Sequence, residues 1–587
     1  MGWRQGVGSI ALVGAMGAAS PCFAQAGSQD AQIQELRAQI QLLQKRIDQL
    51  EAADKARQQS DQAARDADAR ARAAQDQAAQ HHARPAQAKA DAAQKKVLEL
   101  EAANQPRPGP PLPTPSAGRA APPPLSGASP EPVVVAAPRP KSDKPNGTIE
   151  LGGVTFTFGG FIELAGYFRS NNENRSIASS FNTIPFLGPT PQGNIGELGF
   201  TAQQSRFAGK VEGLVDEGTR LVGYGEFDLL NGAGNANSVE TNSYTPRLRQ
   251  AFTQLEYEPW QGYLLAGQAW SLATPFRKGL DPFATWQPPT IDAQYIVGYD
   301  FLRVPALRAV KGFGNFWIGI EADTPQTVFG GNSTPPPPGA TVFTTYPGGG
   351  GLNPQANYSV NVAPDLILKI AADVPLTPDV SGHFEAFGVG RWFTDQISFG
   401  GQSANLTTFG GGVGGSAYVT LGKWVDLSAS VLYGNGIGRY GAGGLPDVTF
   451  NANASLQPLT EGMGTVGGIL HVVPGKLDLY AYYGWDWIGS SYYAGGGGYG
   501  NPANSNMGCF NPNAQAIGLA ATCTGNTQWL SEITVGLNWN ALRGSFGTLR
   551  TGVQYAHITR QAYGGIGGAP FAADDMILVN LRYLPFE

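Results

Sequence analysis

Cysteine is nearly absent, with three residues among 587. Cys22 lies in a segment that we expect to be removed from the mature chain. Cys509 and Cys523 lie in a Gly- and Asn-rich stretch, and in an exported protein their spacing predicts a loop disulfide. The alternative is a pair of free loop thiols. Since no histidine accompanies them, we predict no zinc or other metal site.

Charge is also scarce, because Asp, Glu, Lys and Arg make up 14% of the chain. The net charge of −6 gives no basic footprint, so a nucleic-acid partner is not expected. Glycine is abundant at 80 residues, and aromatic residues reach 10%. This composition is typical of a protein with many strands, tight turns and aromatic girdles.

Long apolar runs are missing as well, since no stretch reaches the roughly 20 residues that a membrane-spanning helix needs. The N-terminus reads as a secretory signal over 1–26, with Arg4 followed by a short apolar segment and small residues before Ala24 and Ala26. We therefore expect an exported protein. In a membrane it would have to form a closed barrel, which satisfies its own backbone hydrogen bonds.

A heptad pattern is present over 29–54. One core position carries Ile33, Ile40 and Ile47, and the other carries Leu36, Leu43 and Leu50. Such a repeat predicts a coiled coil with partner chains, dimeric or trimeric. We assign 27–104 to a periplasmic coiled coil with an Ala-rich helical extension, and 105–146 to a Pro-rich linker.

From 147 to 587 the pattern is that of β-strands. Ile577, Val579 and Leu581 alternate with more polar positions, as expected of strands with one apolar face. A soluble sandwich would alternate too, but here short turns such as 474–475 alternate with long connections such as 489–528. We predict an all-β transmembrane barrel of about 16 antiparallel strands, with 14 or 18 also compatible, enclosing a water-filled channel.

The candidate pore-lining residues are charged side chains on the inward parity of these strands: Arg206, Lys210, Glu212, Arg247, Arg249, Lys369, Arg550 and Arg582. Inward cations would attract anionic solutes, and arginine can hold a carboxylate through two hydrogen bonds. The alternative is that these cations only pair with lumenal acids and keep the pore wet.

The stretch Ser271 to Asp292 is predicted to fold into the pore as a constriction loop. It carries Arg277, Lys278 and Asp281, and fixed charges of both signs would create a transverse field. The alternative is an ordinary extracellular loop. Neither the five histidines nor the Gly-rich runs form a catalytic or phosphate-binding motif, so we predict no enzyme activity and no cofactor.

Several short segments are similar to one known family. They are Gly159–Leu164, Gln204–Phe207, Gly225–Asp228, Arg247–Phe252, Leu264–Trp270 and Pro364–Leu366. On these the chain resembles the DcaP-like outer-membrane porins. The resemblance implies a trimer of 16-stranded barrels with periplasmic coiled coils, and passive uptake of small anionic solutes, dicarboxylates among them. Arg206, Arg247 and Arg249 stand where the family motif carries arginine.

The insert 52–146 departs from the short extension of that family. Two hypotheses therefore remain. The first is an outer-membrane porin, a homotrimer in lipid that passes small hydrophilic solutes and favours anions such as carboxylates. The second is a structural tether, in which the barrel is an anchor and the coiled coil binds peptidoglycan or another periplasmic partner.

Overall fold

The computed structural model describes residues 147–587 apart from 233–243, 332–339, 348–356 and 495–496. The predicted signal, coiled coil and linker lie outside these described residues. Within the part of the chain that is described, no helix has the length and apolar character to cross a membrane.

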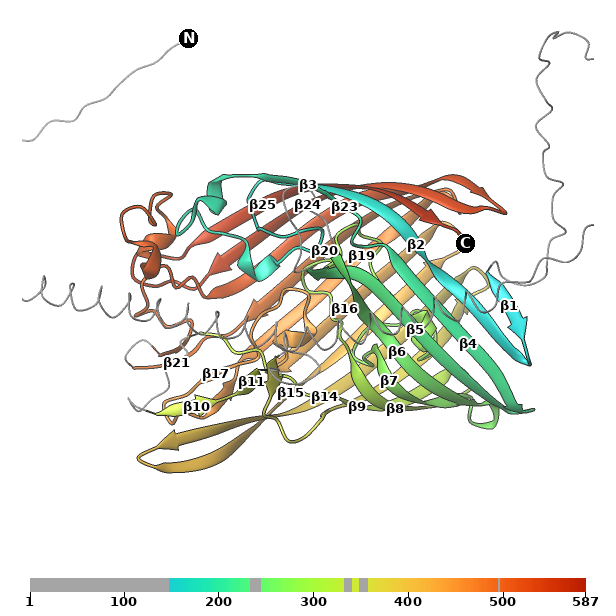
Figure 1. Cartoon of the computed structure of the whole chain (residues 1–587), viewed down its shortest axis with the longest axis horizontal. Coiled ribbons are helices and arrows are strands. Elements are labelled where there is room, and N and C mark those ends of the chain that lie inside the picture. Colours follow the sequence, from blue (N-terminus) through green and yellow to red (C-terminus); the bar gives the residue numbers. More distant parts are fainter. Residues whose placement is uncertain (1–146, 233–243, 332–339, 348–356, 495–496) are drawn as a thin grey trace, which may run out of the picture. The chain divides into compact units, whose positions relative to one another are not determined.

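Sixteen antiparallel strands close into a barrel (Figure 1), each pairing with the next along the chain. The last strand returns to the first, with Ile162 opposite Tyr583 and Arg169 opposite Met576. The sixteen are β2 (Val154–Arg169), β4 (Arg206–Asp216), β5 (Thr219–Gly232), β6 (Tyr244–Tyr257), β7 (Gly262–Trp270), β8 (Arg303–Phe313), β9 (Phe316–Asp323), β13 (Asp365–Thr377), β14 (Val380–Phe399), β15 (Gln402–Leu421), β16 (Val425–Asn435), β19 (Thr460–Val473), β20 (Leu477–Ile488), β23 (Thr527–Gly544), β24 (Gly547–Ala562) and β25 (Phe571–Leu584).

Three short strands complete the main sheet. β1 (Thr148–Leu151) and β3 (Glu197–Thr201) pair with β2, and β10 (Thr341–Phe343) pairs with β14. The loops carry three small hairpins: β11 (Thr345–Pro347) with β12 (Asn357–Ser359), β17 (Val448–Phe450) with β18 (Leu456–Pro458), and β21 (Ser491–Tyr493) with β22 (Gly497–Tyr499). Short 3-10 turns are η1 (Phe181–Thr183), η2 (Pro191–Asn194), η3 (Glu258–Trp260), η4 (Pro282–Ala284), η5 (Gly438–Tyr440), η6 (Met507–Cys509) and η7 (Ala520–Thr522).

The strands have an apolar outer face, and their inward side chains include many polar and charged residues, beside apolar clusters formed with the infolded loops. On β13 the outward residues Leu368 and Ile370 are 52% and 55% exposed, whereas Lys369 between them is fully buried. The same holds on β25, where Ile577 and Leu581 are exposed and Asn580 is buried. Because alternate residues of a strand point to opposite faces, a strand of period two produces this inside-out arrangement directly.

Connections differ at the two ends of the barrel. At one end the strands are joined by tight turns such as 217–218, 314–315 and 378–379. At the other end most connections are long, as over 271–302, 324–364 and 489–526. The exception is 400–401, where β14 and β15 run for 20 residues each and project beyond their neighbours (Figure 1). The long and short connections therefore alternate as the sequence predicts.

The connection 271–302, between β7 and β8, crosses the interior of the barrel. The Ile291 backbone N–H donates to the Gln554 side chain at 2.6 Å, and that of Val297 donates to Glu532 at 2.9 Å. Gln554 and Glu532 belong to β24 and β23, on the wall opposite β8. The infolded segment is thus longer than the predicted 271–292, and we call 271–302 the constriction loop.

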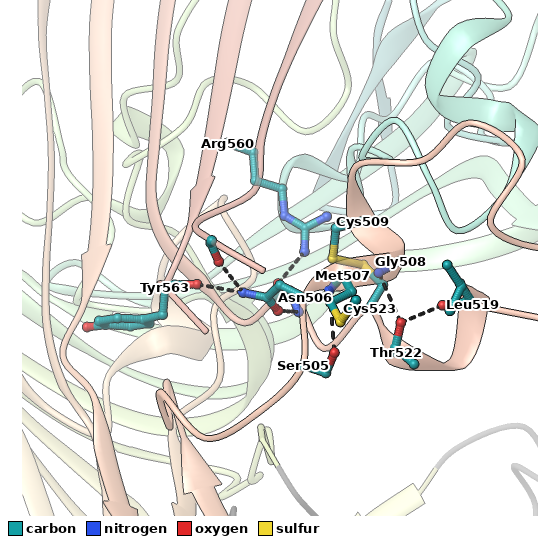
Figure 2. The surroundings of a disulfide bond; sticks show 12 residues. Ser505, Asn506, Met507, Gly508, Cys509, Leu519, Thr522, Cys523, Arg560 and Tyr563 are labelled. Atoms are coloured by element: carbon teal, nitrogen blue, oxygen red, sulfur yellow. Dashed lines mark hydrogen bonds between the residues drawn. A yellow bond between two sulfur atoms is a disulfide. The ribbon is translucent and has the colours of Figure 1, made fainter. Parts of the chain in front are cut away.

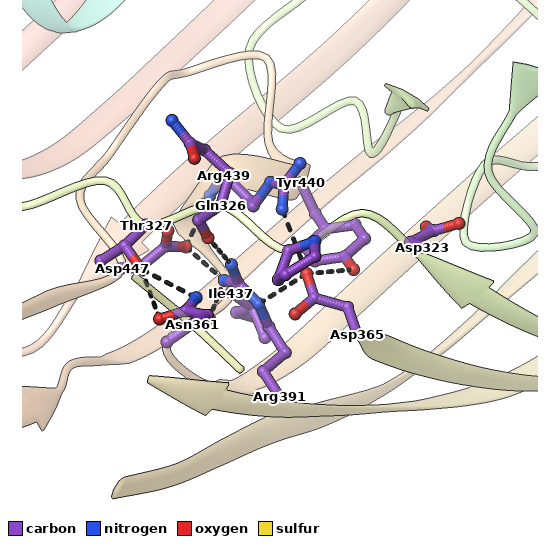
Figure 3. A network of polar contacts seen from close by, with 12 residues as sticks. Asp323, Gln326, Thr327, Asn361, Asp365, Arg391, Ile437, Arg439, Tyr440 and Asp447 are labelled. Atoms are coloured by element: carbon purple, nitrogen blue, oxygen red, sulfur yellow. Dashed lines mark hydrogen bonds and ion pairs between the residues drawn. The ribbon is translucent and has the colours of Figure 1, made fainter. Parts of the chain in front are cut away.

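At the end of the barrel with the long connections, a buried arginine holds two of these loops (Figure 3). Arg391 on β14 bridges Asp365 at 3.1 Å and Asp447 at 2.6 Å, and donates to the Gln326 carbonyl at 2.6 Å. Because Gln326 and Asp447 belong to connections 324–364 and 436–459, one side chain ties both loops to the wall. These bonds keep the two loops in place over the barrel mouth.

Candidate functional site: an arginine-lined lumen

Arg249 reaches the lumen through an irregularity in β6. Glu226 on β5 pairs with Gln250, and the next residue, Phe227, pairs with Leu248, so Arg249 is left without a partner. Such a bulge turns a side chain away from the regular alternation. This explains why Arg247 and Arg249 stand on a segment that alternates poorly in the sequence.

Carboxylates on β5 hold the arginines of β4 and β6. Arg206 lies 3.3 Å from Glu226, which also pairs with Arg249. Asp228 accepts from Arg249 at 2.7 Å and from Arg247 at 2.8 Å. Charge-assisted contacts of this kind fix guanidinium groups in one orientation. The arginines are therefore preorganised along one wall.

Four predicted residues meet at one small cavity of about 120 Å³. Its wall carries Arg206, Arg249, Arg550 and Arg582, and of the described residues that line it Asp292 is the one carboxylate. Arg582 is also paired with Glu163 at 2.6 Å. The cavity, which we call the arginine cavity, therefore presents several cations to anything that enters.

The constriction loop forms the other side of the arginine cavity. Asp292 accepts from the Ser179 hydroxyl, at 2.5 Å, and from the Ser179 backbone N–H, at 3.2 Å. Burial raises the pKa of this carboxyl, although Arg169 nearby acts in the opposite sense. Ser179 belongs to the connection 170–205 between β2 and β4, which we call the first long connection. The position of the constriction loop therefore depends on contacts from a second loop.

A wider cavity of about 720 Å³ lies against the same wall, toward the tight-turn end. It is lined by Lys210, Glu212, Lys278 and Asp281 among others. Lys210 pairs with Glu212 at 2.9 Å and lies 5.2 Å from the Phe283 ring centre. Arg206 and Lys210 share β4, so this strand faces both cavities and joins them along one wall.

Three other predicted residues line neither cavity: Arg247, which pairs with Asp228, and Lys369 and Arg277. Lys369 is fully buried beneath the constriction loop, where it pairs with Glu385 at 3.0 Å and donates to the Thr274 carbonyl at 2.9 Å. Arg277 is exposed on the loop and lines neither cavity. Lys369 thus anchors the loop, and the field at the cavities comes from the other charges.

The structure joins Cys509 and Cys523 through a disulfide in the connection 489–526 (Figure 2). Asn506 beside it donates to the Tyr563 carbonyl at 3.0 Å, and Arg560 donates to the Gly525 carbonyl at 3.1 Å. The bridge and these bonds hold the loop against the end of β24.

Sequence reasoning missed two residues of this region. Arg303, the first residue of β8, lies 4.8 Å from the Trp270 ring centre. Tyr295, on the constriction loop, lines the arginine cavity. Neither stands in a regular alternation, and no pattern in the sequence marks them. The carboxylates Glu226 and Asp228 lie in Gly225–Asp228, one of the segments that resemble the porin family, but their sequence pattern does not predict that they hold the arginines.

No family model and no curated protein matches the chain. Solved structures do. The outer membrane channel DcaP of Acinetobacter baumannii is 15% identical, with a TM-score of 0.50 over 75% of this chain and 99% of that one. An anion-selective porin from Comamonas acidovorans is 10% identical, with a TM-score of 0.36 over 73% and 99%. The similarity to the first shows a shared barrel fold.

Proposed function

We propose that the protein is an outer-membrane porin, a water-filled channel for small hydrophilic solutes that favours anions. One observation carries the proposal. The closed barrel has an apolar exterior and encloses a small cavity at which Arg206, Arg249, Arg550 and Arg582 meet. Inward cations raise the local concentration of anions and lower the barrier to their passage.

The exterior supports the membrane location. Exposed leucine, isoleucine, valine and aromatic side chains cover strands all around the barrel, which suits hydrocarbon and would be unstable in water. The tight-turn end then faces the periplasm and the long connections face outward. In this orientation residues 27–146 lie in the periplasm after removal of the signal.

Liposome swelling tests the channel. Vesicles containing the purified full-length protein are placed in isosmotic solutions of a small sugar or of a carboxylate salt of similar size. A porin produces swelling in both, and faster swelling with the carboxylate. Equal rates for the two solutes would remove the anion preference, and no swelling above empty vesicles would remove the channel.

The assembly is proposed to be a homotrimer, with the heptads of 29–54 joining the chains. Isoleucine and leucine at the two core positions need partner helices to bury them. Cross-linking of the native protein against a variant lacking 27–146 tests this. Loss of cross-linked trimer only in the shortened chain is the expected result.

The second candidate function is a tether to the cell wall through 52–146. The length of this segment favours it, because a coiled coil that only joins three chains would not need the 95 residues that follow the heptads. Peptidoglycan sedimentation with and without 52–146 decides the matter. Equal sedimentation of both forms would leave the segment as a spacer.

A further inference from the structure

Arg303 carries a charge that no described residue neutralises. Its Nε and Nη1 atoms are buried and have no hydrogen-bond acceptor among the described residues. The facing Trp270 ring, at 4.8 Å, supplies only a cation–π contact. Arg303 is half-buried as a residue, but donors that are shielded from water without an acceptor are unfavourable, so these two nitrogens call for an acceptor such as an anion.

Three more arginines lie close by. Arg249 faces the same Trp270 ring at 5.9 Å. Arg247 shares the Asp228 carboxylate with Arg249, and Arg206 shares the Glu226 carboxylate with it. We call Arg206, Arg247, Arg249 and Arg303 the arginine cluster.

The arginine cluster has too few fixed anions. The described residues offer it two ion-paired carboxylates, Glu226 and Asp228. Four guanidinium groups thus share two negative charges, and two positive charges remain. Besides the two free atoms of Arg303, Nη2 of Arg249 is buried without an acceptor. Unused donors and unbalanced charge occur at the same place.

The arginine cluster adjoins the path of a solute. Trp270 lies 6.2 Å from Tyr295, measured between ring centres, and Tyr295 lines the arginine cavity together with Arg206 and Arg249. An ion that enters this cavity therefore comes next to the unused donors.

We propose that the arginine cluster is a saturable binding site for a doubly charged oxyanion, and that Arg303 is the residue that sets its affinity. This rests on the proposed channel, which it deepens, because the ion is held on the way through. Guanidinium groups present several N–H donors in a plane, which match the separate oxygens of an oxyanion better than a halide. Two excess charges fit a dianion.

Inorganic phosphate is the probe, at about pH 8, where most of it is doubly charged. Binding to the detergent-purified full-length protein is measured by calorimetry, and block of the chloride current is measured in planar bilayers. Both should saturate. Arg303→Gln should raise the phosphate concentration for half-saturation by roughly tenfold or more, since charge-assisted hydrogen bonds are lost. Arg303→Lys, which keeps the charge without the planar fork, should fall between.

Lys311→Gln is the control, because it removes one charge from the same strand at a position beside Trp260 and Phe313, away from the cluster. It should leave phosphate affinity unchanged. Equal half-saturation in the native protein, Arg303→Gln and Arg303→Lys, or binding that never saturates, would overturn the site while the channel stands. Saturable binding lost in Arg303→Gln, without any current through the native protein, would support the site and overturn the channel.

Discussion

At the scale of single residues, the electrostatic field in the lumen depends on which arginines and carboxylates form ion pairs with each other. Arg249 is buried and pairs with both Glu226 and Asp228. Its removal therefore has two effects, because a cation leaves the cavity and two carboxylates lose a partner. Both effects shift the field in the same direction, toward cations.

Arg249→Gln is expected to lower the chloride-to-potassium permeability ratio by roughly threefold or more, since lumenal charge sets ion selectivity. Reversal potentials in a salt gradient measure the ratio. Arg543→Gln, at an exposed position at the tight-turn end of β23, is the matched control. An unchanged ratio in Arg249→Gln would show that this arginine does not act on passing ions.

Glu173 makes the stability of the first long connection depend on pH. Burial raises its pKa to about 7, despite the nearby Arg169 and a hydrogen bond from the Ser180 backbone N–H at 2.9 Å. The folded loop therefore binds a proton that the unfolded loop releases. The resulting stabilisation is complete below the ordinary pKa of a glutamate and is lost as the pH rises through about 7.

Hydrogen exchange over 170–185 tests this effect. After correction for the intrinsic rate, protection should be weaker at about pH 8 than at about pH 6, by about 1 kcal/mol. Glu173→Gln stays neutral and should remove the difference. A native protein whose protection is the same at both pH values would contradict the prediction.

At the scale of elements, the constriction loop determines how much of the lumen is open. Two of its attachments to the far wall, Ile291 to Gln554 and Val297 to Glu532, join segments more than 230 residues apart in sequence. The sequence predicts that a charged loop enters the pore, because Ser271 to Asp292 combines charges with aromatic residues. It cannot predict the attachments, since Gln554 stands in an ordinary alternating strand.

Gln554→Leu keeps the approximate size of the side chain and removes the acceptor for Ile291. The tip of the loop should then move more freely, and single-channel conductance should rise by about half, with more current noise. Gln561→Leu, at the rim end of the same strand, serves as the control. Identical conductance in all three proteins would mean that the loop does not limit the current.

The disulfide acts on one loop. Closing a ring of this size stabilises the folded loop by about 3 kcal/mol, mainly by restricting the unfolded chain. With Cys509→Ser and Cys523→Ser together, proteases should cut within 510–522 while the barrel keeps its resistance to sodium dodecyl sulfate. Equal cutting of the native and double-mutant loops would show that Asn506 and Arg560 suffice to hold it.

The sequence predicts the regular parts of the wall well, because alternation reports which face each residue takes. Alternation is less informative where the strands are irregular. Arg249 sits in a bulge and was still among the predicted pore-lining residues, whereas Arg303, which starts a strand directly after a long loop, was not. Lys369 has the inward parity that was predicted, but only the folded loop above it reveals an anchoring role. Such residues depend on tertiary neighbours that local pattern does not encode.

At the scale of the whole molecule, the barrel is closed by its own strand pairs, from β2 round to β25. Its conduction should therefore not need the N-terminal region. A chain that keeps the signal but lacks 27–146 is expected to retain the native single-channel conductance within about a fifth. Loss of conductance in the shortened chain would assign the N-terminal region a part in forming the pore.

The reversal potential of the purified full-length protein in a planar bilayer, across a potassium chloride gradient, tests the central claim most directly. We predict stepwise openings and a reversal potential shifted toward the equilibrium potential of chloride, because the arginine cavity carries an excess of positive charge. A reversal potential shifted toward the equilibrium potential of potassium would contradict the assignment of the arginines as the selectivity-determining residues.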